Sequence, residues 1–329
     1  MICDRMGIMK EIQISYIIPC FRSAKTLRTV VEEIDATMEV MPEYDYEIIL
    51  VNDASPDDTY DVIKQLCDEK PYLVGIDLSR NFGQHAALMA GFHQAAGDIV
   101  VCLDDDGQTP ANEAIKLIRA LEAGADAVYA KYIQKQHSGL RNIGSRLNDL
   151  MVRTMLGKPK NLYISSYFAV KRFVADEIKQ YDGPYAYVIG LVLRTTKNIV
   201  NVDVAHRARI DGASGYTIGK LFALWLNGFT AFSIKPLRIT TLFGASSAIV
   251  GFLYAIYTIF KRIFIQPEGL SIGFSALMSA VLVIGGVILL MLGMVGEYIG
   301  RMYITMNHSP QYVIKEIKRY RKIEEKIRS

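Results

Sequence analysis

Cysteine is scarce in this sequence, and its placement argues against two kinds of structure. The four cysteines are Cys3, Cys20, Cys67 and Cys102, and no two of them stand in a C-x-x-C arrangement. Neither a disulfide framework nor a cysteine zinc site is therefore indicated. The formal net charge is only +3, which argues against a chain that binds nucleic acid through its whole surface. The first ten residues hold no continuous apolar stretch of the kind found in a secretory signal.

Charged side chains are absent from two long stretches near the C-terminus. Residues 239–260 and 269–296 contain no Asp, Glu, Lys or Arg. A helix needs about 20 apolar residues to cross the roughly 30 Å hydrocarbon layer of a bilayer, and both stretches are long enough. The alternative is a buried helical hairpin in a soluble protein, although two adjacent runs of this length rarely fit one soluble core. We therefore expect two transmembrane α-helices, with residues 236–300 forming a hairpin.

Basic residues after the second apolar stretch predict the side of the membrane on which the chain ends. Residues 301–329 hold eight Lys and Arg against three Glu, and an excess of Lys and Arg beside a span marks the cytoplasmic side. Lys261 and Arg262 lie between the spans and weaken this asymmetry without reversing it. Two spans return the C-terminus to the side where the chain begins. We expect an inner-membrane protein with residues 1–235 as a cytoplasmic domain and residues 301–329 as a basic tail near anionic membrane lipids.

Strand and helix patterns alternate through the first 130 residues. Such alternation predicts an α/β domain with a mostly parallel, Rossmann-like sheet that is covered by helices on both faces. Ligands of these sheets bind beyond the carboxyl ends of the strands, so polar residues after each strand are the first candidates for chemistry. The expected strands are 12–19, 46–52, 72–78, 99–103 and 127–130, and the expected helices are 25–38, 57–69, 83–96 and 110–123. Two further helical patterns, 137–157 and 220–232, suit either the membrane interface or an ordinary core-facing helix.

The strongest chemical signal is a run of three carboxylates directly after a predicted buried strand. Asp104, Asp105 and Asp106 are consecutive, and Gln108 follows closely. Crowding like charges is costly, and a divalent cation would offset the cost. Oxygen ligands completed by phosphate oxygens suit Mg²⁺ or Mn²⁺. An acid-rich turn is the alternative, whereas an EF-hand would place its last ligand at Ile115, which cannot bind calcium.

Two other strand ends carry residues that suit a nucleotide. Asp53 follows the second predicted strand, where an acidic side chain can hydrogen-bond a base or a ribose. Asp57 or Asp58 would more commonly cap the next helix. Phe21 follows the first predicted strand, and an aromatic ring there can pack against a base. Each of these signals is weak alone, so their order along the chain matters more than any one of them.

Taken in order, these motifs make the chain resemble the inverting glycosyltransferases of family 2, which have the GT-A fold. Within that family it is similar to the branch that glycosylates polyprenyl phosphates, which includes bactoprenol glucosyltransferases, dolichol-phosphate mannose synthases and undecaprenyl-phosphate aminoarabinose transferases. The most specific segment is 79–98, which matches the R-N-x-G…A-x-x-x-G…G-D pattern of this branch. The resemblance covers nearly the whole chain, including both apolar stretches.

The resemblance implies a role for each matching residue. Those that would bind the nucleotide-sugar donor are Pro19, Phe21, Asp53, Asp104, Asp105, Arg209, Ser214 and Tyr216. Those that would hold the Mg²⁺ or Mn²⁺ ion are Asp104, Asp106 and Gln108. Those expected to act at the reaction centre are Asp104, Asp106, Lys131, Arg141 and Ser145. Arg141 and Ser145 match an R-x-x-x-S pair for the acceptor phosphate, and they would share one helix face. Residues 209–216 match a late motif that would close over the donor.

The chain departs from the family pattern at three places. Arg22-Ser23 replaces the usual asparagine and glutamate after the first strand, and Thr109 follows Gln108 where an acidic residue is common. Gly215 replaces a lysine that would help the leaving diphosphate, and Lys220 or Arg207 could compensate.

The resemblance implies transfer of a sugar, with inversion, to undecaprenyl phosphate or another polyprenyl phosphate, and it favours a UDP-sugar over a GDP-sugar. A phosphate monoester is largely dianionic at neutral pH and can attack without a strong general base, so catalysis would depend on positioning and on the metal. A processive polysaccharide synthase would normally carry a Q-x-x-R-W motif, which is missing around Trp225, the only tryptophan. A non-catalytic scaffold that binds nucleotide sugars is the other alternative. Gly285, Gly286 and Gly293 would suit close helix packing in a homo-oligomer.

Overall fold

The structure is a computed structural model, and it divides into two compact units. The first unit is Met1–Ile218 with Ser309–Ser329, and the second is Gly219–His308. The part of the chain that the structure describes is residues 13–132, 158–159, 161–184, 186–205, 207, 235–264, 274–307 and 309–320, together with the short antiparallel strands β1 (Ile2–Cys3) and β2 (Met9–Lys10).

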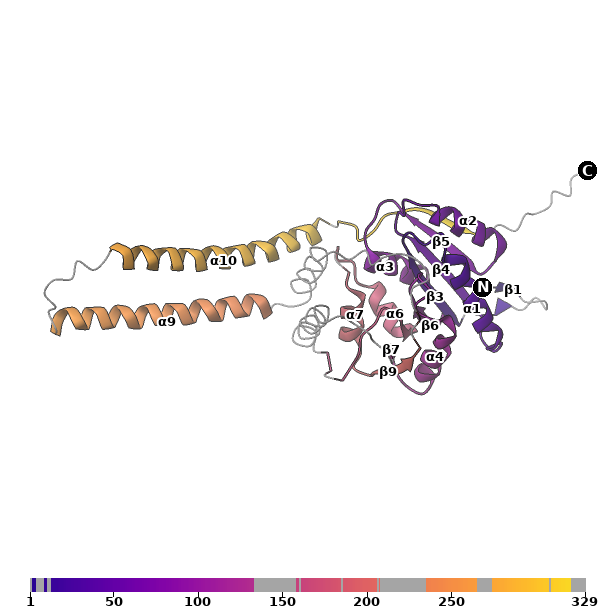
Figure 1. Cartoon of the computed structure of the whole chain (residues 1–329), viewed down its shortest axis with the longest axis horizontal. Coiled ribbons are helices and arrows are strands. Elements are labelled where there is room, and N and C mark those ends of the chain that lie inside the picture. Colours follow the sequence, from indigo (N-terminus) through magenta and orange to yellow (C-terminus); the bar gives the residue numbers. More distant parts are fainter. Residues whose placement is uncertain are drawn as a thin grey trace, which may run out of the picture. The chain divides into compact units, whose positions relative to one another are not determined.

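An eight-stranded mixed sheet forms the centre of the first unit (Figure 1). Its strands are β3 (Ile14–Cys20), β4 (Tyr46–Asn52), β5 (Leu73–Leu78), β6 (Ile99–Cys102), β7 (Ala127–Tyr132), β8 (Phe168–Lys171), β9 (Ile199–Val204) and β10 (Ile314–Arg319). Their order across the sheet is β10-β5-β4-β3-β6-β8-β7-β9. The central strands β5, β4, β3 and β6 run parallel, while β8 and β10 are antiparallel to their neighbours. The expected mostly parallel α/β sheet is confirmed, and β8, β9 and β10 are strands that the sequence patterns did not predict.

Helices cover both faces of this sheet, as the alternating pattern predicts. One face carries α1 (Leu27–Glu39), α2 (Thr59–Glu69) and α4 (Ala114–Glu122), the last preceded by the 3₁₀ turn η1 (Ala111–Glu113). The other face carries α3 (Gln84–Gln94), α6 (Arg172–Lys179) and α7 (Val188–Thr195). The buried residues of α1 recur at helical spacing, and they pack with the inward-facing side chains of β3 and β4 in one core.

Two glycines of the segment 79–98 allow close packing against β3. A Cβ atom on Gly91, in α3, would lie 2.3 Å from Cγ2 of Ile17. A Cβ atom on Gly97 would lie 2.7 Å from the backbone nitrogen of Ser15, and the Gly97 N–H donates to Ser15 Oγ at 2.8 Å. Both glycines thus let the chain of α3 and its exit loop approach β3 more closely than any side chain would permit.

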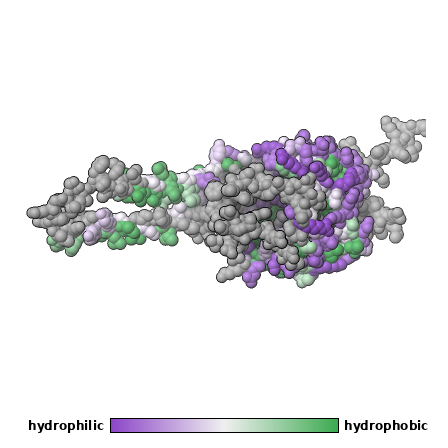
Figure 2. Space-filling model, viewed as in Figure 1, coloured by the Kyte–Doolittle hydropathy of each residue, from purple (hydrophilic) through white to green (hydrophobic). Residues whose placement is uncertain are grey.

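The second unit contains two long helices, α9 (Lys235–Phe264) and α10 (Phe274–Met306). Apolar side chains lie on their surfaces (Figure 2); Leu242 and Leu289, for example, are 69% and 71% exposed. Among the described residues, one segment is long and apolar enough to cross a membrane, namely Val283–Met306 of α10. The apolar stretch Thr240–Tyr254 of α9 is shorter. One candidate span is therefore found, and the second stays a prediction.

The two long helices approach each other at a glycine. A Cβ atom on Gly244, in α9, would lie 2.1 Å from Cε of Met291 in α10. The glycines that we expected at a helix contact behave differently, because a Cβ on Gly285, Gly286 or Gly293 would meet no described atom within 4 Å. Their part in an oligomer stays a prediction.

The range 301–329, predicted as one basic tail, is divided by the structure. Residues 301–306 complete α10, and Ile314–Arg319 form β10, which pairs with β5 at the edge of the sheet. The sequence predicts a basic tail from its excess of Lys and Arg, and an edge strand can carry the same charges because it is exposed on one side. The chain therefore returns to the first unit after the helical hairpin.

Candidate active site

The predicted acidic run lies at the carboxyl end of β6, near the middle of the sheet. Asp104, Asp105 and Asp106 are all partly buried, and Gly107 turns the chain behind them with a φ of 71°. Burial raises the pKa of Asp104 to about 6, and the charges of Asp106 and Asp105 add to this effect. Three carboxylates in such a place repel one another, so this is a point where a cation would be stabilised.

Both carboxylate oxygens of Asp104 accept hydrogen bonds from protein side chains. Gln84, the first residue of α3, donates through Nε2 to Oδ1 at 2.9 Å, and the Ser166 hydroxyl, just before β8, donates to Oδ2. Tyr132, at the end of β7, lies close enough that the charges of Asp104 and Asp106 add to the rise in its pKa that burial causes. We assigned no site role to any of these three residues from sequence. Gln84 stands within the matching segment 79–98, whereas Ser166 and Tyr132 carry no local signal.

Asp105 joins the acidic run to the loop after β3. Its carboxylate accepts the Phe21 N–H at 3.0 Å and the Ser23 hydroxyl, and its carbonyl accepts the Thr26 hydroxyl at 2.6 Å. Burial raises the pKa of Asp105, while the hydrogen bonds from Ser23 and Phe21 oppose that rise. The departure at Ser23 therefore has a structural use, because its hydroxyl is a partner of this carboxylate.

Phe21 and Arg22 present an exposed surface beside this carboxylate. The Phe21 ring is 45% exposed, and the Arg22 guanidinium lies 5.6 Å from its centroid. Arg22 has a left-handed backbone with φ of 60°, and its N–H donates to Ser55 Oγ at 2.7 Å. An aromatic ring beside a cation suits a nucleobase next to a diphosphate. Pro19 lies within β3 opposite Val51, so it contributes to this edge through the backbone of the strand.

Asp53 is buried at the end of β4, and its carboxylate holds another loop. Its two oxygens accept the N–H groups of Phe82 at 2.7 Å and Gly83 at 2.8 Å. The Asn81 side chain donates to its carbonyl at 3.3 Å. Burial raises the pKa of Asp53, and the two backbone hydrogen bonds oppose the rise. Each oxygen keeps a second lone pair, so the predicted donor contact stays open beside this positioning role.

Asp106 and Gln108 form a tight turn, and this turn is hydrogen-bonded to Arg207, which follows the end of β9. Asp106 Oδ1 accepts the Gln108 N–H at 3.0 Å, and the Gln108 carbonyl accepts the Arg207 N–H at 3.1 Å. The Arg207 guanidinium pairs with Glu33 of α1. As the structure stands, Arg207 thus directs its charge to Glu33, and Lys220, the other residue considered as a substitute for the missing lysine, lies outside the described residues.

The predicted acceptor-phosphate residues are only partly described. Lys131 lies near the end of β7, and its Nζ is 3.5 Å from Asp203 Oδ1, with both side chains more than half exposed. A pair this exposed is weak and exchanges readily with other anions. Five predicted site residues lie outside the described residues, namely Arg141, Ser145, Arg209, Ser214 and Tyr216.

The carboxylates suit a metal ion that is shared with a phosphate ligand, and they do not form a complete metal site by themselves. Among the described residues, no group of three His, Cys, Asp or Glu side chains converges in a way that could hold an ion. Mg²⁺ at phosphate-transfer sites commonly takes one or two carboxylates and completes its shell with phosphate oxygens and water. Asp104 and Asp106 are close enough for the charge of one to raise the pKa of the other. They therefore suit an ion that is shared with a bound diphosphate.

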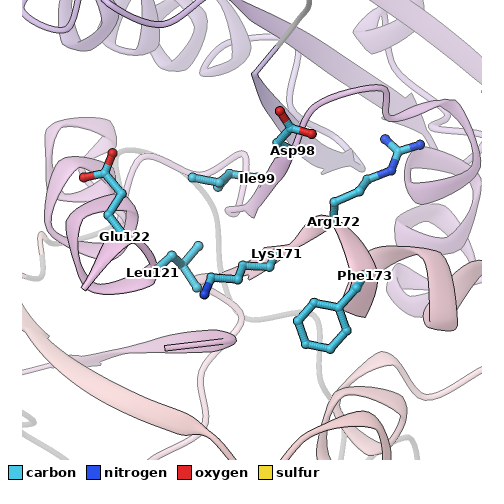
Figure 3. Close-up of a pocket in the computed structure, with 7 residues that line it drawn as sticks. All are labelled: Asp98, Ile99, Leu121, Glu122, Lys171, Arg172 and Phe173. Carbon is cyan, nitrogen blue, oxygen red and sulfur yellow. The ribbon is translucent and has the colours of Figure 1, made fainter. Parts of the chain in front are cut away.

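A hollow of about 370 Å³ lies at the opposite end of the strands from the acidic run, where β6 begins (Figure 3). Lys171, Arg172 and Phe173 line it together with Asp98 and Glu122. The Arg172 guanidinium there donates to backbone carbonyls of residues 95 and 97 and pairs with an aspartate of its own helix. The hollow thus lies at the amino end of the strand whose carboxyl end carries the acidic run, and we assign it no function.

Comparison with known proteins identifies the family of this chain. Residues 15–179 match the family described as Glycosyl transferase family 2, and residues 235–302 match the GtrB C-terminal hairpin. The chain belongs to glycosyl transferase family 2. This confirms the resemblance drawn from the motifs, and it makes the protein a glycosyltransferase with a C-terminal hairpin of the GtrB type.

The similar proteins include enzymes of one named activity. The undecaprenyl-phosphate 4-deoxy-4-formamido-L-arabinose transferase of Serratia proteamaculans (strain 568) is 29% identical over 306 residues, which cover 93% of this chain and 94% of that protein. The enzyme of the same name from Yersinia enterocolitica serotype O:8 is also 29% identical, with 93% of each chain covered. The crystal structure of mannosyl-3-phosphoglycerate synthase from Rubrobacter xylanophilus has a TM-score of 0.52 at 19% identity and covers 69% of this chain and 74% of that chain. That likeness concerns the fold, and with the family match it supports the GT-A assignment.

Proposed function

We propose that this glycosyltransferase moves a sugar, with inversion, from a nucleotide-sugar donor to the phosphate of a polyprenyl lipid such as undecaprenyl phosphate. The observation that carries the proposal is the acidic run at the carboxyl end of β6, oriented by Gln84 and Ser166, in a family 2 chain that continues into a GtrB-type hairpin. Relatives that align with 93% of this chain are named undecaprenyl-phosphate 4-deoxy-4-formamido-L-arabinose transferases. The named sugar of those relatives is not carried over, because about 29% identity does not define a sugar pocket.

The residues of this chain would act mainly by positioning the two substrates. Asp104 and Asp106 would bind Mg²⁺ or Mn²⁺ together with the donor diphosphate, and Gln108 would line the same turn. The metal would stabilise the negative charge of the leaving nucleoside diphosphate. The lipid phosphate, largely dianionic at neutral pH, would attack the anomeric carbon directly. Lys131 would attract that phosphate, and we retain Arg141 and Ser145 as its predicted ligands.

The donor is proposed to be a UDP-sugar held at the ends of β3 and β4. The exposed Phe21 ring and the Arg22 guanidinium would contact the base and the diphosphate, and Asp53, which also holds the loop of Phe82 and Gly83, would contact the base or the ribose. Arg209, Ser214 and Tyr216 would close over the donor, as the late motif predicts. GDP-sugars are the alternative donors to be compared in the assay.

The helical hairpin is proposed to hold the catalytic unit at the cytoplasmic face of the cell membrane. α9 and α10 carry large exposed apolar side chains. Exposing a continuous apolar surface of this kind to water is unfavourable, and such a surface marks a site of contact with a membrane or another protein. Because β10 follows the hairpin and pairs with β5, the chain must return to the side that it left. That return supports an even number of crossings, and hence two spans, even though the uninterrupted apolar stretch of α9 is short.

The test is transfer of label from a panel of UDP- and GDP-sugars to undecaprenyl phosphate by the purified full-length protein in detergent with Mn²⁺ or Mg²⁺. The D106A variant removes a carboxylate of the proposed metal site. The D61A variant removes an exposed carboxylate that pairs with Lys64 on α2 and serves as the matched control. One donor should give a lipid-extractable product that is lost with D106A and with EDTA but kept with D61A. Metal-dependent donor binding without any product would instead favour the scaffold alternative.

A further inference from the structure

The strand that follows the hairpin, β10, touches the loops at the carboxyl ends of β4 and β5 by two routes. The first route is backbone: the Ser79 N–H donates to the Val313 carbonyl at 2.9 Å. Ser79 begins the loop whose Phe82 and Gly83 N–H groups bind Asp53. The segment just before β10 therefore holds one end of the loop, and Asp53 holds the other end.

The second route runs through a buried aspartate. Asp77 of β5 is only 5% exposed, and its two carboxylate oxygens have different partners. Oδ2 lies 3.3 Å from Lys315 Nζ on β10, and Oδ1 accepts a 2.7 Å hydrogen bond from Asn52 Nδ2 at the end of β4. Burying a carboxylate is costly unless it is paired and hydrogen-bonded. Asp77 therefore fixes the Asn52 side chain, while Lys315 supplies the compensating charge.

Asn52 passes this constraint to the loop that carries Arg22. Its Oδ1 accepts the Ser55 N–H at 3.2 Å, and Ser55 Oγ in turn accepts the Arg22 N–H at 2.7 Å. Arg22 and Ala54, the residue before Ser55, are the two non-glycine residues with positive φ in the part of the chain that the structure describes, at 60° and 48°. Left-handed backbone is unfavourable for such residues and persists only where contacts enforce it. The chain of contacts that ends on Lys315 has a hydrogen bond at each of these two turns.

We infer that Asp77 and Lys315 are positioning residues, and that β10 holds the donor-binding loops in shape through them. Neither residue is among the proposed donor contacts. Asp77 is hydrogen-bonded to Asn52, which is hydrogen-bonded to Ser55, and Ser55 is hydrogen-bonded to Arg22. Asp77 therefore helps to fix the position of the loop that carries Phe21 and Arg22. The inference rests on the proposed function for the identity of the donor, whereas the contacts themselves concern this chain alone. By this inference, β10 not only forms the edge of the sheet but also supports donor binding.

Three variants of the full-length protein test this inference, with one matched control. D77N keeps the shape of the side chain and removes its charge, K315M removes the ammonium, and the double variant combines the two changes. K318M is the control, because Lys318 also lies on β10 and pairs with Asp68 at 2.6 Å, but neither belongs to the chain of contacts. The probes are hydrogen exchange at the backbone amides, which needs no ligand, and binding of UDP and of GDP.

We expect D77N and K315M to speed exchange at the amides of Arg22 and Ser55, and to weaken nucleotide binding by about threefold to tenfold. The double variant should be no worse than the poorer single variant, because residues in one chain of contacts are not additive. In turnover, KM for the donor should rise while KM for the lipid phosphate stays constant. K318M should leave all of these values at those of the wild type.

Two outcomes would overturn the inference. Exchange at the amides of Arg22 and Ser55 could stay at wild-type rates in D77N and K315M, or K318M could speed it equally, and either result would show that β10 only stabilises the sheet in general. If the wild-type protein binds neither UDP nor GDP, the proposed donor is wrong, yet the exchange measurements still decide whether β10 holds the loops. Failure of the proposed function and failure of this inference are therefore distinguishable.

Discussion

The side-chain amide of Gln84 donates a 2.9 Å hydrogen bond to Oδ1 of Asp104. This bond joins the first turn of α3 to the end of β6, and it orients the carboxylate proposed to bind the metal ion. Gln84 also follows Gly83, whose φ of 92° turns the chain into the helix. The loop after β5 is therefore joined to the acidic run after β6.

Replacing Gln84 by leucine should lower turnover with little effect on folding. A hydrogen bond to a charged group is worth about 1.5–3 kcal/mol, so the loss of activity should be about tenfold to a hundredfold. The measurement is kcat in the lipid-transfer assay. Q180L is the control, because Gln180 is a surface glutamine that pairs with Glu177. Equal effects of the two changes would show that Gln84 has no particular role at the carboxylate.

Activity should fall as the pH is lowered through about 6. Asp104 has a raised pKa of about 6 because it is buried and because Asp106 and Asp105 lie near it. Below that pH it is protonated and a poor metal ligand, so the donor-metal complex should weaken. A pH profile at fixed and at saturating Mn²⁺ checks this, and excess metal should move the fall to lower pH. A profile that is flat between pH 5 and 7 would contradict the assignment.

The same group should affect stability with the opposite trend. A carboxyl whose folded pKa lies above its unfolded value binds more protons in the folded state. The metal-free protein should therefore lose stability through Asp104 as the pH rises from about 4 to about 6. Thermal unfolding with EDTA measures this, and D104N should reduce the slope. Adding Mn²⁺ above pH 6 should restore the lost stability, because the ion binds the ionised form.

Asp105 should affect the donor rather than the acceptor. In D105A the Phe21 N–H and the Ser23 hydroxyl lose their shared acceptor, so the loop that carries the exposed ring should loosen. We expect KM for the donor to rise by about tenfold, in line with the loss of hydrogen bonds to one charged group. KM for the lipid phosphate should stay constant, and S23A should reproduce part of the effect. A change confined to kcat would contradict this role.

Alanine at Gly97 should destabilise the first unit more than alanine at Gly91. At Gly97 the new Cβ would meet backbone atoms of Ile14 and Ser15, which cannot move without disturbing β3, whereas at Gly91 it would meet a side chain, that of Ile17. Overpacking of this kind costs about 1–3 kcal/mol or more. G285A in α10, where a Cβ meets no described atom, is the control. Comparison of the thermal unfolding of the three variants checks the order.

Much of the first unit could be predicted from sequence because its signals are local. The strand Tyr46–Asn52 is found at the expected bounds, and the other predicted strands shift by a residue or two. Buried parallel strands are short apolar runs between helices, and that pattern is visible in the sequence. β8 is only four residues long, which leaves a weak signal, and β9 is only partly buried, with exposed residues among its six. β10 lies within the range predicted as a basic tail, because an excess of Lys and Arg suits an exposed edge strand as well as a segment near anionic lipids.

The sequence by itself determined the family, the acidic run and the two apolar stretches, because each is a property of neighbouring residues. Only the tertiary structure decided which groups meet. Asp104 is hydrogen-bonded to Gln84 and Ser166, which are 20 and 62 positions away in the sequence. Lys315 of β10 pairs with Asp77 of the neighbouring strand β5. Hydrogen bonds and ion pairs act over a few ångströms in space and do not depend on separation along the chain. A sequence therefore reveals the chemical groups, and the fold selects their partners.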